Sequence, residues 1–179
     1  MTPNHILHFW FNELKPADWW AKSSELDRTI AQRFAEVHHA ASQGELFEWR
    51  VSAKGSLAEV IILDQFSRNI YRDSAQAFAQ DAQALTLSQR AIERGFNHEL
   101  SQVEQQFLYL PFMHSESRLI HQHAEKLYAE LDAGFGYDFE IKHKLIIDRF
   151  GRYPHRNLVL GRESTEEELE FLKQPGSSF

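Results

Sequence analysis

Apolar residues in this chain recur at intervals of three and four, and no stretch of useful length alternates apolar and polar residues with period two. The first pattern places side chains on one face of an α-helix, whereas alternation is typical of a half-buried strand. Ile30, Phe34 and Val37 show the helical spacing clearly, and their pattern ends before Gly44. We therefore predict an all-α protein.

Start and stop signals divide the chain into short helices. A Ser/Thr–x–x–Glu pattern, which satisfies two backbone N–H groups at a helix start, begins at Ser101 and at Thr165. Gly151 follows an amphipathic stretch and is predicted to end it. Pro111 is predicted to interrupt its helix, because proline removes a donor and clashes with the preceding turn. These signals indicate about eight helices, packed as antiparallel neighbours with short connections.

Length and composition favour one globular domain, which we place over residues 1–173 with a tail over 174–179. The 179 residues are 42% hydrophobic and 25% charged, which is a globular balance. The pI near 5.8 disfavours nucleic acid and anionic membranes as partners. The chain has no cysteine, and no window approaches the roughly 20 apolar residues of a membrane span. We expect a cytoplasmic protein without a cofactor.

The clearest polar feature is an arginine-rich segment, residues 149–162, which contains four arginines, one histidine and no acid. The chain has a formal charge of −7, so this segment of +4 leaves −11 on the remainder. The guanidinium groups of Arg149, Arg152, Arg156 and Arg162 need carboxylate partners within the protein or an anionic ligand. At the end of a helix, Arg149 and Arg152 can also complement the exposed carbonyl groups.

Asp64 interrupts an apolar helical face, because it lies three positions after Ile61. A carboxylate at such a place is costly unless it is paired, and Arg68 follows at the favourable spacing of four. One interpretation is an internal ion pair that fixes helix packing. The alternative is a carboxylate that orients an arginine in a binding pocket.

A second polar group follows Pro111, where His114 and Glu116 lie two residues apart. They are candidates for acid–base partners, as is His155, although an acid near a helix start is also favoured by the helix dipole alone. The spacing does not favour a metal, so we predict none. His123 and His143 are interpreted as core histidines, and His38 and His39 as surface residues.

Three strings together resemble a bacterial domain-of-unknown-function family, number 924: LDQFSRNIYR at 63–72, PFMHSE at 111–116 and RFGRYPHRNLVLGRESTEEELEFL at 149–172. The likeness extends over almost the whole chain. It implies a compact, right-handed array of stacked helix pairs similar to tetratricopeptide folds, with a concave face. The resemblance also implies that the family has histidine at the positions of His143 and His155. This chain departs from the family pattern at Ser67, where proline is frequent. No reaction or ligand is implied.

Three functions fit these observations. The favoured one is a binding module whose basic and histidine-containing pocket holds the carboxylate or phosphate of a small molecule, peptide or protein. The second is a small hydrolase that uses His114, Glu116 or His155 for acid–base chemistry, with arginines stabilising negative charge. The third is a purely structural polar network. The candidate ligand-binding residues are Asp64, Arg68, Asn69, Arg72, Arg149, Arg152, Arg156, Asn157 and Arg162.

Overall fold

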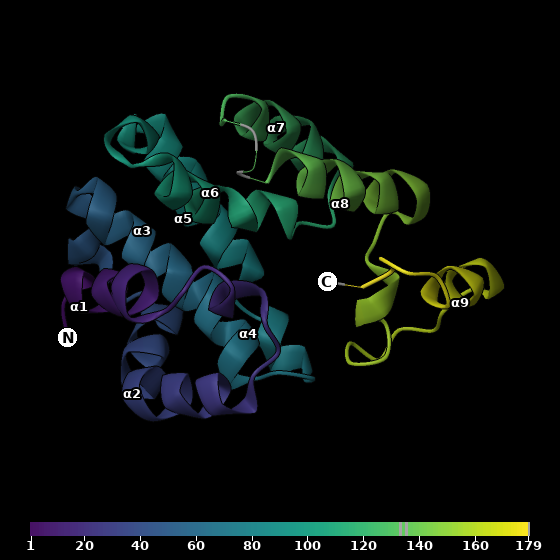
Figure 1. Ribbon diagram of the computed structural model, residues 1–179, viewed down its shortest axis with the longest axis horizontal. Coiled ribbons are helices and arrows are strands. Elements are labelled where there is room, and N and C mark those ends of the chain that lie inside the picture. Colours follow the sequence, from purple (N-terminus) through teal and green to yellow (C-terminus); the bar gives the residue numbers. More distant parts are fainter. Residues whose placement is uncertain (133, 135, 179) are drawn as a thin grey trace.

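The computed structural model describes residues 1–132, 134 and 136–178, and all regular structure within them is helical (Figure 1). The helices are α1 Pro3–His8, α2 Ser24–Ser42, α3 Ala53–Ile61, α4 Ser67–Ile70, α5 Asp81–Glu93, α6 Gln102–Met113, α7 Arg118–Ala129, α8 Tyr137–Phe150 and α9 Glu166–Leu172. The predicted all-α class is therefore confirmed. The finer resemblance to tetratricopeptide arrays stays a prediction.

Short helical turns of other types lengthen or connect these helices. A turn of π-helix, Ile62–Phe66, joins α3 to α4, so the chain stays helical from residue 53 to residue 70. Such turns are frequent at functional sites, because the wider turn changes the direction of the following side chains. A second π-helical turn, Phe9–Glu13, extends α1. Turns of 3₁₀-helix occur at Asp18–Trp20, Phe47–Val51, Ala75–Phe78, Phe96–Glu99 and Pro154–Arg156.

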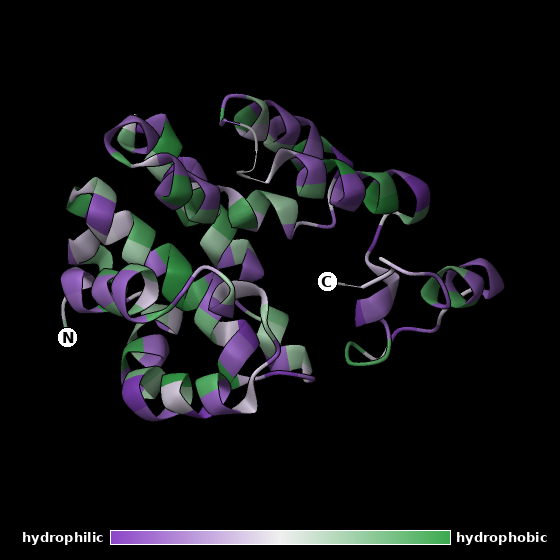
Figure 2. Cartoon of the chain, viewed as in Figure 1, coloured by the Kyte–Doolittle hydropathy of each residue, from purple (hydrophilic) through white to green (hydrophobic). Residues whose placement is uncertain are grey.

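The main core surrounds α3, whose apolar residues include Leu57, Val60 and Ile61, each fully buried. A helix that is apolar nearly all round has to be covered on several sides, and α1, α5 and α6 all contact α3. The rings of Trp10 and Phe107 meet edge to face at 5.6 Å within this core. Figure 2 shows the hydrophobic colour concentrated on α3 and α6 in the middle of the larger part of the molecule.

The C-terminal part is attached through α7 and α8. These two helices are antiparallel, since Arg118 at the start of α7 donates to the carbonyl of Asp148 near the end of α8. Gly151 ends α8 with a left-handed φ of 69°, as predicted. A smaller apolar cluster of Ile147 and Tyr153 with their neighbours then supports the segment that leads to α9. In Figure 1 this segment follows α8 at one side of the molecule, and its Arg156 contacts Asp81 at the start of α5.

Three predictions about individual residues were wrong. The helix α6 continues through Pro111 to Met113, because Pro111 and its neighbours are buried in the core, and packing outweighs the roughly 3 kcal/mol that an internal proline costs. His38 is buried, and its Nε2 lies 2.8 Å from Oγ of Ser67. His123 is exposed, because α7 buries the neighbouring face that carries His121.

Candidate functional site

Among the arginines of the predicted site, Arg152 and Arg162 belong to a C-terminal network, and Arg68 and Arg156 belong to a cluster at the centre of the molecule. The C-terminal network consists of Glu116, Arg152, Tyr153, Asn157, Arg162 and Glu168. The central group, here called the hollow cluster, consists of Asp64, Arg68, Asp81, His114 and Arg156. Arg72 and Asn69 belong to neither, because both donate to the carboxylate of Asp27 on α2.

Glu116 is the centre of the C-terminal network. Its carboxylate accepts two hydrogen bonds from Arg162, at 2.6 and 3.0 Å, and a third from the backbone N–H of Tyr153 at 2.7 Å. Arg162 in turn donates from Nε to Oδ1 of Asn157 at 2.9 Å. A planar guanidinium that forks onto a carboxylate fixes both groups in orientation. This pair therefore ties the loop before α9 to the segment before α7.

The first two arginines of the basic segment pair with acids of α9. Arg152 donates from Nε and Nη2 to Glu168 at 2.6 and 2.7 Å, and Arg149 contacts Glu167 at 2.8 Å. Glu168 also accepts from the backbone N–H of Thr165, which completes the predicted capping box of α9. Arg149 and Arg152 thus pair with acids of the same protein, and the pair of Arg149 with Glu167 is exposed on both sides.

Removing the charge of Glu168 is expected to destabilise the protein by about 2–3 kcal/mol near neutral pH, because several charge-assisted hydrogen bonds are lost. The hydrogen bond from Arg152 holds the pKa of Glu168 at about 2, below its ordinary value. The carboxylate therefore contributes its stabilisation above the ordinary carboxyl range and loses it as the pH falls towards 2. Urea unfolding of Glu168→Gln and the parent protein at several pH values will measure this. An energy difference that does not shrink in acid would contradict it.

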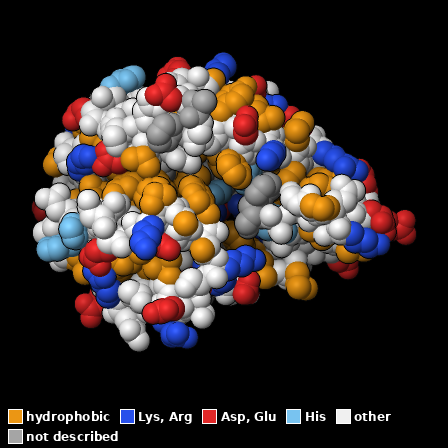
Figure 3. Space-filling view, viewed as in Figure 1, with side chains coloured by type: hydrophobic (Ala, Val, Ile, Leu, Met, Phe, Trp, Pro, Cys, Tyr) orange, Lys and Arg blue, Asp and Glu red, His pale blue; other side chains and the backbone are white. Residues whose placement is uncertain are grey.

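The hollow cluster is assembled from five segments. Asp64 lies in the π-helical turn, Arg68 in α4, and Asp81 is the first residue of α5. His114 caps the C-terminus of α6, and Arg156 ends the turn Pro154–Arg156. Figure 3 shows that the surface is hollowed between the larger N-terminal part and the C-terminal segment, with Lys/Arg and His colours at the bottom of the hollow.

Asp64 and His114 form a hydrogen-bonded pair at the base of this cluster. The Asp64 side chain is fully buried, and its Oδ1 lies 2.7 Å from Nδ1 of His114. Burial acts to raise the pKa of Asp64, but Arg68 and His114 together outweigh it, so this pKa lies below its ordinary value. An ionised carboxylate only accepts, so Nδ1 of His114 donates, and in the neutral ring the lone pair is then on Nε2. Burial, followed by the charge of Arg68, lowers the pKa of His114.

Arg68 connects the two acids of the cluster. Its Nη1 lies 3.2 Å from Oδ1 of Asp64, and the same guanidinium donates to both oxygens of Asp81, at 2.8 and 3.0 Å. Asp81 was not predicted from sequence. In the structure it is the first residue of α5, where an acid is favoured by the helix dipole, but its contact with Arg68 joins residues 13 positions apart, which no local spacing indicates.

Arg156 has the weakest partners in the cluster. Its side chain is 7% exposed and is placed between two rings, with the guanidinium carbon 4.5 Å from the centroids of both Phe78 and Tyr153. Within the part of the chain that the structure describes, it makes one hydrogen bond, from Nη1 to Asp81 at 3.4 Å, and its buried Nε has no acceptor. Burial and the nearby charge of Arg68 lower its pKa. This guanidinium has hydrogen-bonding capacity that the described residues do not use.

The remaining histidines near the cluster have other partners. His155 is half-buried beside Tyr153, and burial together with Arg156 lowers its pKa to about 4. His143 is buried, and its Nδ1 lies 2.7 Å from the carbonyl of Phe139. Glu116, predicted as a possible partner of His114, instead contacts Arg162 and the backbone of Tyr153. Of the acid–base candidates, His114 with Asp64 has the geometry of a general base and its orienting carboxylate.

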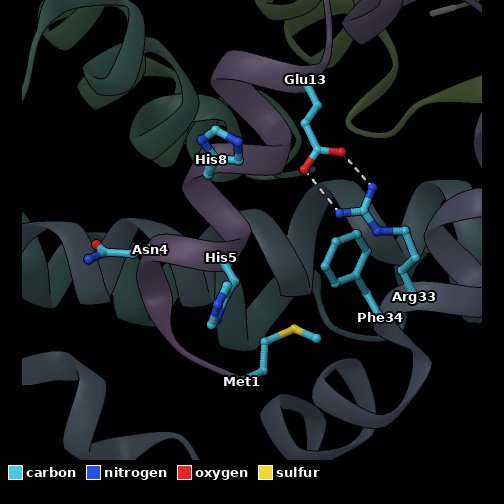
Figure 4. Close-up of a pocket in the computed structure, with 7 residues that line it drawn as sticks. All are labelled: Met1, Asn4, His5, His8, Glu13, Arg33 and Phe34. Atoms are coloured by element: carbon cyan, nitrogen blue, oxygen red, sulfur yellow. Dashed lines mark hydrogen bonds and ion pairs between the residues drawn. The ribbon is translucent and has the colours of Figure 1, made fainter.

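A separate pocket of about 610 Å³ lies at the N-terminus, between α1 and α2. Figure 4 shows its lining, in which Glu13 points at Arg33 and both carboxylate oxygens are used, at 2.6 and 3.0 Å. His5 is likewise engaged, because its Nδ1 completes the cap of Thr2. Glu13, Arg33 and His5 of this pocket are thus already engaged within the protein. Among the described residues, no group of three histidines and acids could hold a metal ion, and no described helix is long and apolar enough to cross a membrane.

Comparison with known proteins places this arrangement in a family. A solved structure titled as a protein of unknown function from Agrobacterium tumefaciens is similar over 96% of both chains, with 37% identity and a TM-score of 0.91. No curated protein matches the chain significantly. The family model described as "Bacterial protein of unknown function (DUF924)" matches residues 6–176, which include every residue of both polar networks. The chain therefore belongs to the DUF924 family of bacterial proteins.

Proposed function

We propose that this protein binds an anionic group of a small molecule or peptide in the hollow at Arg156. The observation that carries the proposal is the incomplete pairing of this guanidinium. The other arginines of the predicted site fork onto carboxylates at 2.6–3.0 Å, whereas Arg156 has one bond of 3.4 Å and an unused Nε. A buried N–H donor without an acceptor is costly, and an oxygen of an anionic ligand would accept from this guanidinium.

The surroundings of Arg156 support binding rather than a purely structural role. The rings of Phe78 and Tyr153 hold the guanidinium from two sides, which fixes its plane before any ligand arrives. A fixed donor loses little conformational entropy on binding. The side chains of Arg68 and His114, which are 19% and 14% exposed, belong to the same cluster and supply further polar contacts at the hollow.

A thermal-shift experiment with acetate and inorganic phosphate tests this proposal. Either anion, compared with chloride at equal ionic strength, is expected to raise the melting temperature, because a ligand that binds only the folded state stabilises it. For a chain of this length, each kcal/mol of binding energy corresponds to roughly 2–4 °C. Arg156→Gln is expected to remove the shift, while Arg90→Gln, which breaks an exposed ion pair on α5, is expected to retain it.

Two results would overturn the proposal. If acetate and phosphate both leave the melting temperature unchanged, at concentrations well above ordinary metabolite levels, an anion site is excluded. An equal shift in Arg156→Gln and in the parent protein would place the anion elsewhere. Arg156→Lys separates the loss of charge from the loss of shape, because lysine retains the charge but cannot reproduce the planar donor set.

The Asp64–His114 pair favours hydrolysis as a second candidate function. Nε2 of His114 has no hydrogen bond among the described residues and is placed to take a proton from water, whose oxygen would then bond to the acyl or phosphoryl centre of the substrate. The leaving oxygen would recover that proton, and Arg68 would stabilise the negative charge that develops. A screen of aryl esters and aryl phosphates tests this. Turnover should disappear in His114→Gln and persist in His123→Gln; no turnover of any substrate would exclude it.

A further inference from the structure

The charges of the hollow cluster are balanced before any ligand binds. Arg68 and Arg156 are opposed by Asp64 and Asp81, and all four groups are connected by the contacts at 3.2, 2.8 and 3.4 Å. His114 adds no charge, because its Nδ1–H donates to Asp64 and its Nε2 has a lone pair. An anion that enters would leave an uncompensated negative charge at a place largely sheltered from water. Such a charge costs several kcal/mol unless it is neutralised.

Nε2 of His114 is the group that can neutralise it. No residue of the described chain hydrogen-bonds to this nitrogen, and it is not among the fully buried polar atoms that have no partner, so solvent reaches it. The Asp64 carboxylate on the opposite side of the ring stabilises an imidazolium as readily as it orients the neutral ring. Proton uptake here requires no movement of the pair. We infer that the hollow binds a carboxylate together with one proton, and that His114 Nε2 holds the proton.

This inference rests on the proposed anion site and specifies its ligand class. A carboxylate has a single negative charge, so one proton on His114 restores the neutral balance of the cluster. A phosphate monoester has a charge of about −1.5 to −2 near neutral pH, and one proton leaves much of it uncompensated beside Asp64 and Asp81. The site should therefore prefer carboxylates.

The groups that face His114 determine the direction of the pH dependence. Asp64 and Asp81 favour its protonated form, Arg68 opposes it, and His143 of α8 and His155 are more distant cations if protonated. Burial, followed by Arg68, holds the pKa of free His114 below its ordinary value, so the unliganded ring is neutral at neutral pH. A bound carboxylate raises that pKa. Binding is then strongest below the pKa of the complex and weakens as the pH rises through it.

Calorimetric titration with acetate, from about pH 6 to about pH 8, tests the inference, because acetate stays ionised over this range while histidine does not. The association constant is expected to fall with rising pH, by up to about tenfold per pH unit. Titrations in two buffers of different ionisation enthalpy should show proton uptake approaching one per acetate. The His114 ring-proton NMR signal, assigned by its absence in His114→Gln, should move to its protonated position when acetate is added. Phosphate should bind more weakly than acetate near the upper pH.

Each outcome separates this inference from the proposed function. Acetate that binds with the same affinity at all pH values, and without proton uptake, would overturn the inference and leave the anion site intact. The same would follow if His114→Gln retained the full pH dependence. If acetate and phosphate both fail to bind at any pH, the anion site itself is wrong. Tighter binding of phosphate than of acetate across the range would refute the assigned ligand class.

Discussion

Asp64→Ala is expected to destabilise the protein by about 3–5 kcal/mol, because removing one partner of a buried pair leaves the other partner without compensation. The Asp64 side chain has no exposed surface and accepts from His114, Arg68 and Gln65. Without it, Arg68 retains the carboxylate of Asp81 and the backbone carbonyl of residue 64, and the donor at Nδ1 of His114 faces a cavity. Chemical unfolding followed by circular dichroism will measure the loss.

Asp64→Asn is the matched control for shape. The amide oxygen can still accept from Nδ1 of His114, so this variant removes the charge and keeps most of the volume. We expect a loss of about 2–3 kcal/mol, intermediate between the parent and the alanine variant. A loss below about 1 kcal/mol in Asp64→Ala would mean that the cluster is not desolvated. In that case, an anion bound at the hollow would need no proton to balance its charge.

Glu140→Ala is expected to have a comparable effect, about 3–5 kcal/mol, at a site that no ligand can reach. Glu140 and His121 both have fully buried side chains, and Oε1 of Glu140 lies 2.7 Å from Nδ1 of His121. Nε2 of His121 faces the carbonyl of Ser115 at 2.8 Å, so it must donate. The pair therefore retains one proton between Nδ1 and Oε1, and truncation of Glu140 leaves a buried imidazole nitrogen without its partner.

Glu140→Gln should cost less than about 1 kcal/mol near neutral pH, because an amide can donate to Nδ1 of a neutral ring. Burial raises the pKa of Glu140 above its ordinary value. A group with a raised carboxyl pKa contributes its stability in acid and loses it as the pH rises through the folded-state value. The parent protein should thus lose stability relative to Glu140→Gln with rising pH. Parallel stability curves for the two proteins would show that the pair does not share a titrating proton.

The hollow cluster around Asp64 and the His121–Glu140 pair differ in how far solvent can reach their polar groups. The His121–Glu140 pair is fully buried, so its side chains hold helices α7 and α8 together. The hollow cluster has the same kinds of residue but is partly exposed at Arg68, Asp81 and His114. Partial exposure is what makes Nε2 of His114 available to a ligand beside Arg156, whose own side chain is 7% exposed. This difference in accessibility, and not residue type, supports a binding role for one cluster and a structural role for the other.

Much of the fold could be predicted from sequence, because helix boundaries depend on local chemistry. The capping boxes at Ser101 and Thr165 and the left-handed Gly151 involve residues within a few positions of each other, and the structure contains all three. The pairing of Arg68 with Asp64 was also predictable, because it follows from helical spacing. Pro111 was wrongly predicted to break its helix. The cost of a proline inside a helix is offset here by packing against residues of the core that are distant in the sequence.

The amino-acid sequence by itself determined that this protein is helical, where most of its helices begin and end, and that its arginines require acids. Only the tertiary structure decided which acids they meet. Asp81 reaches Arg156 across 75 positions, and Glu116 reaches Arg162 across 46, so no local pattern could indicate either contact. It also decided that Arg156 alone among these arginines lacks a close partner among the described residues. Pairing across such distances depends on how helices pack in three dimensions, and packing is a property of the whole chain.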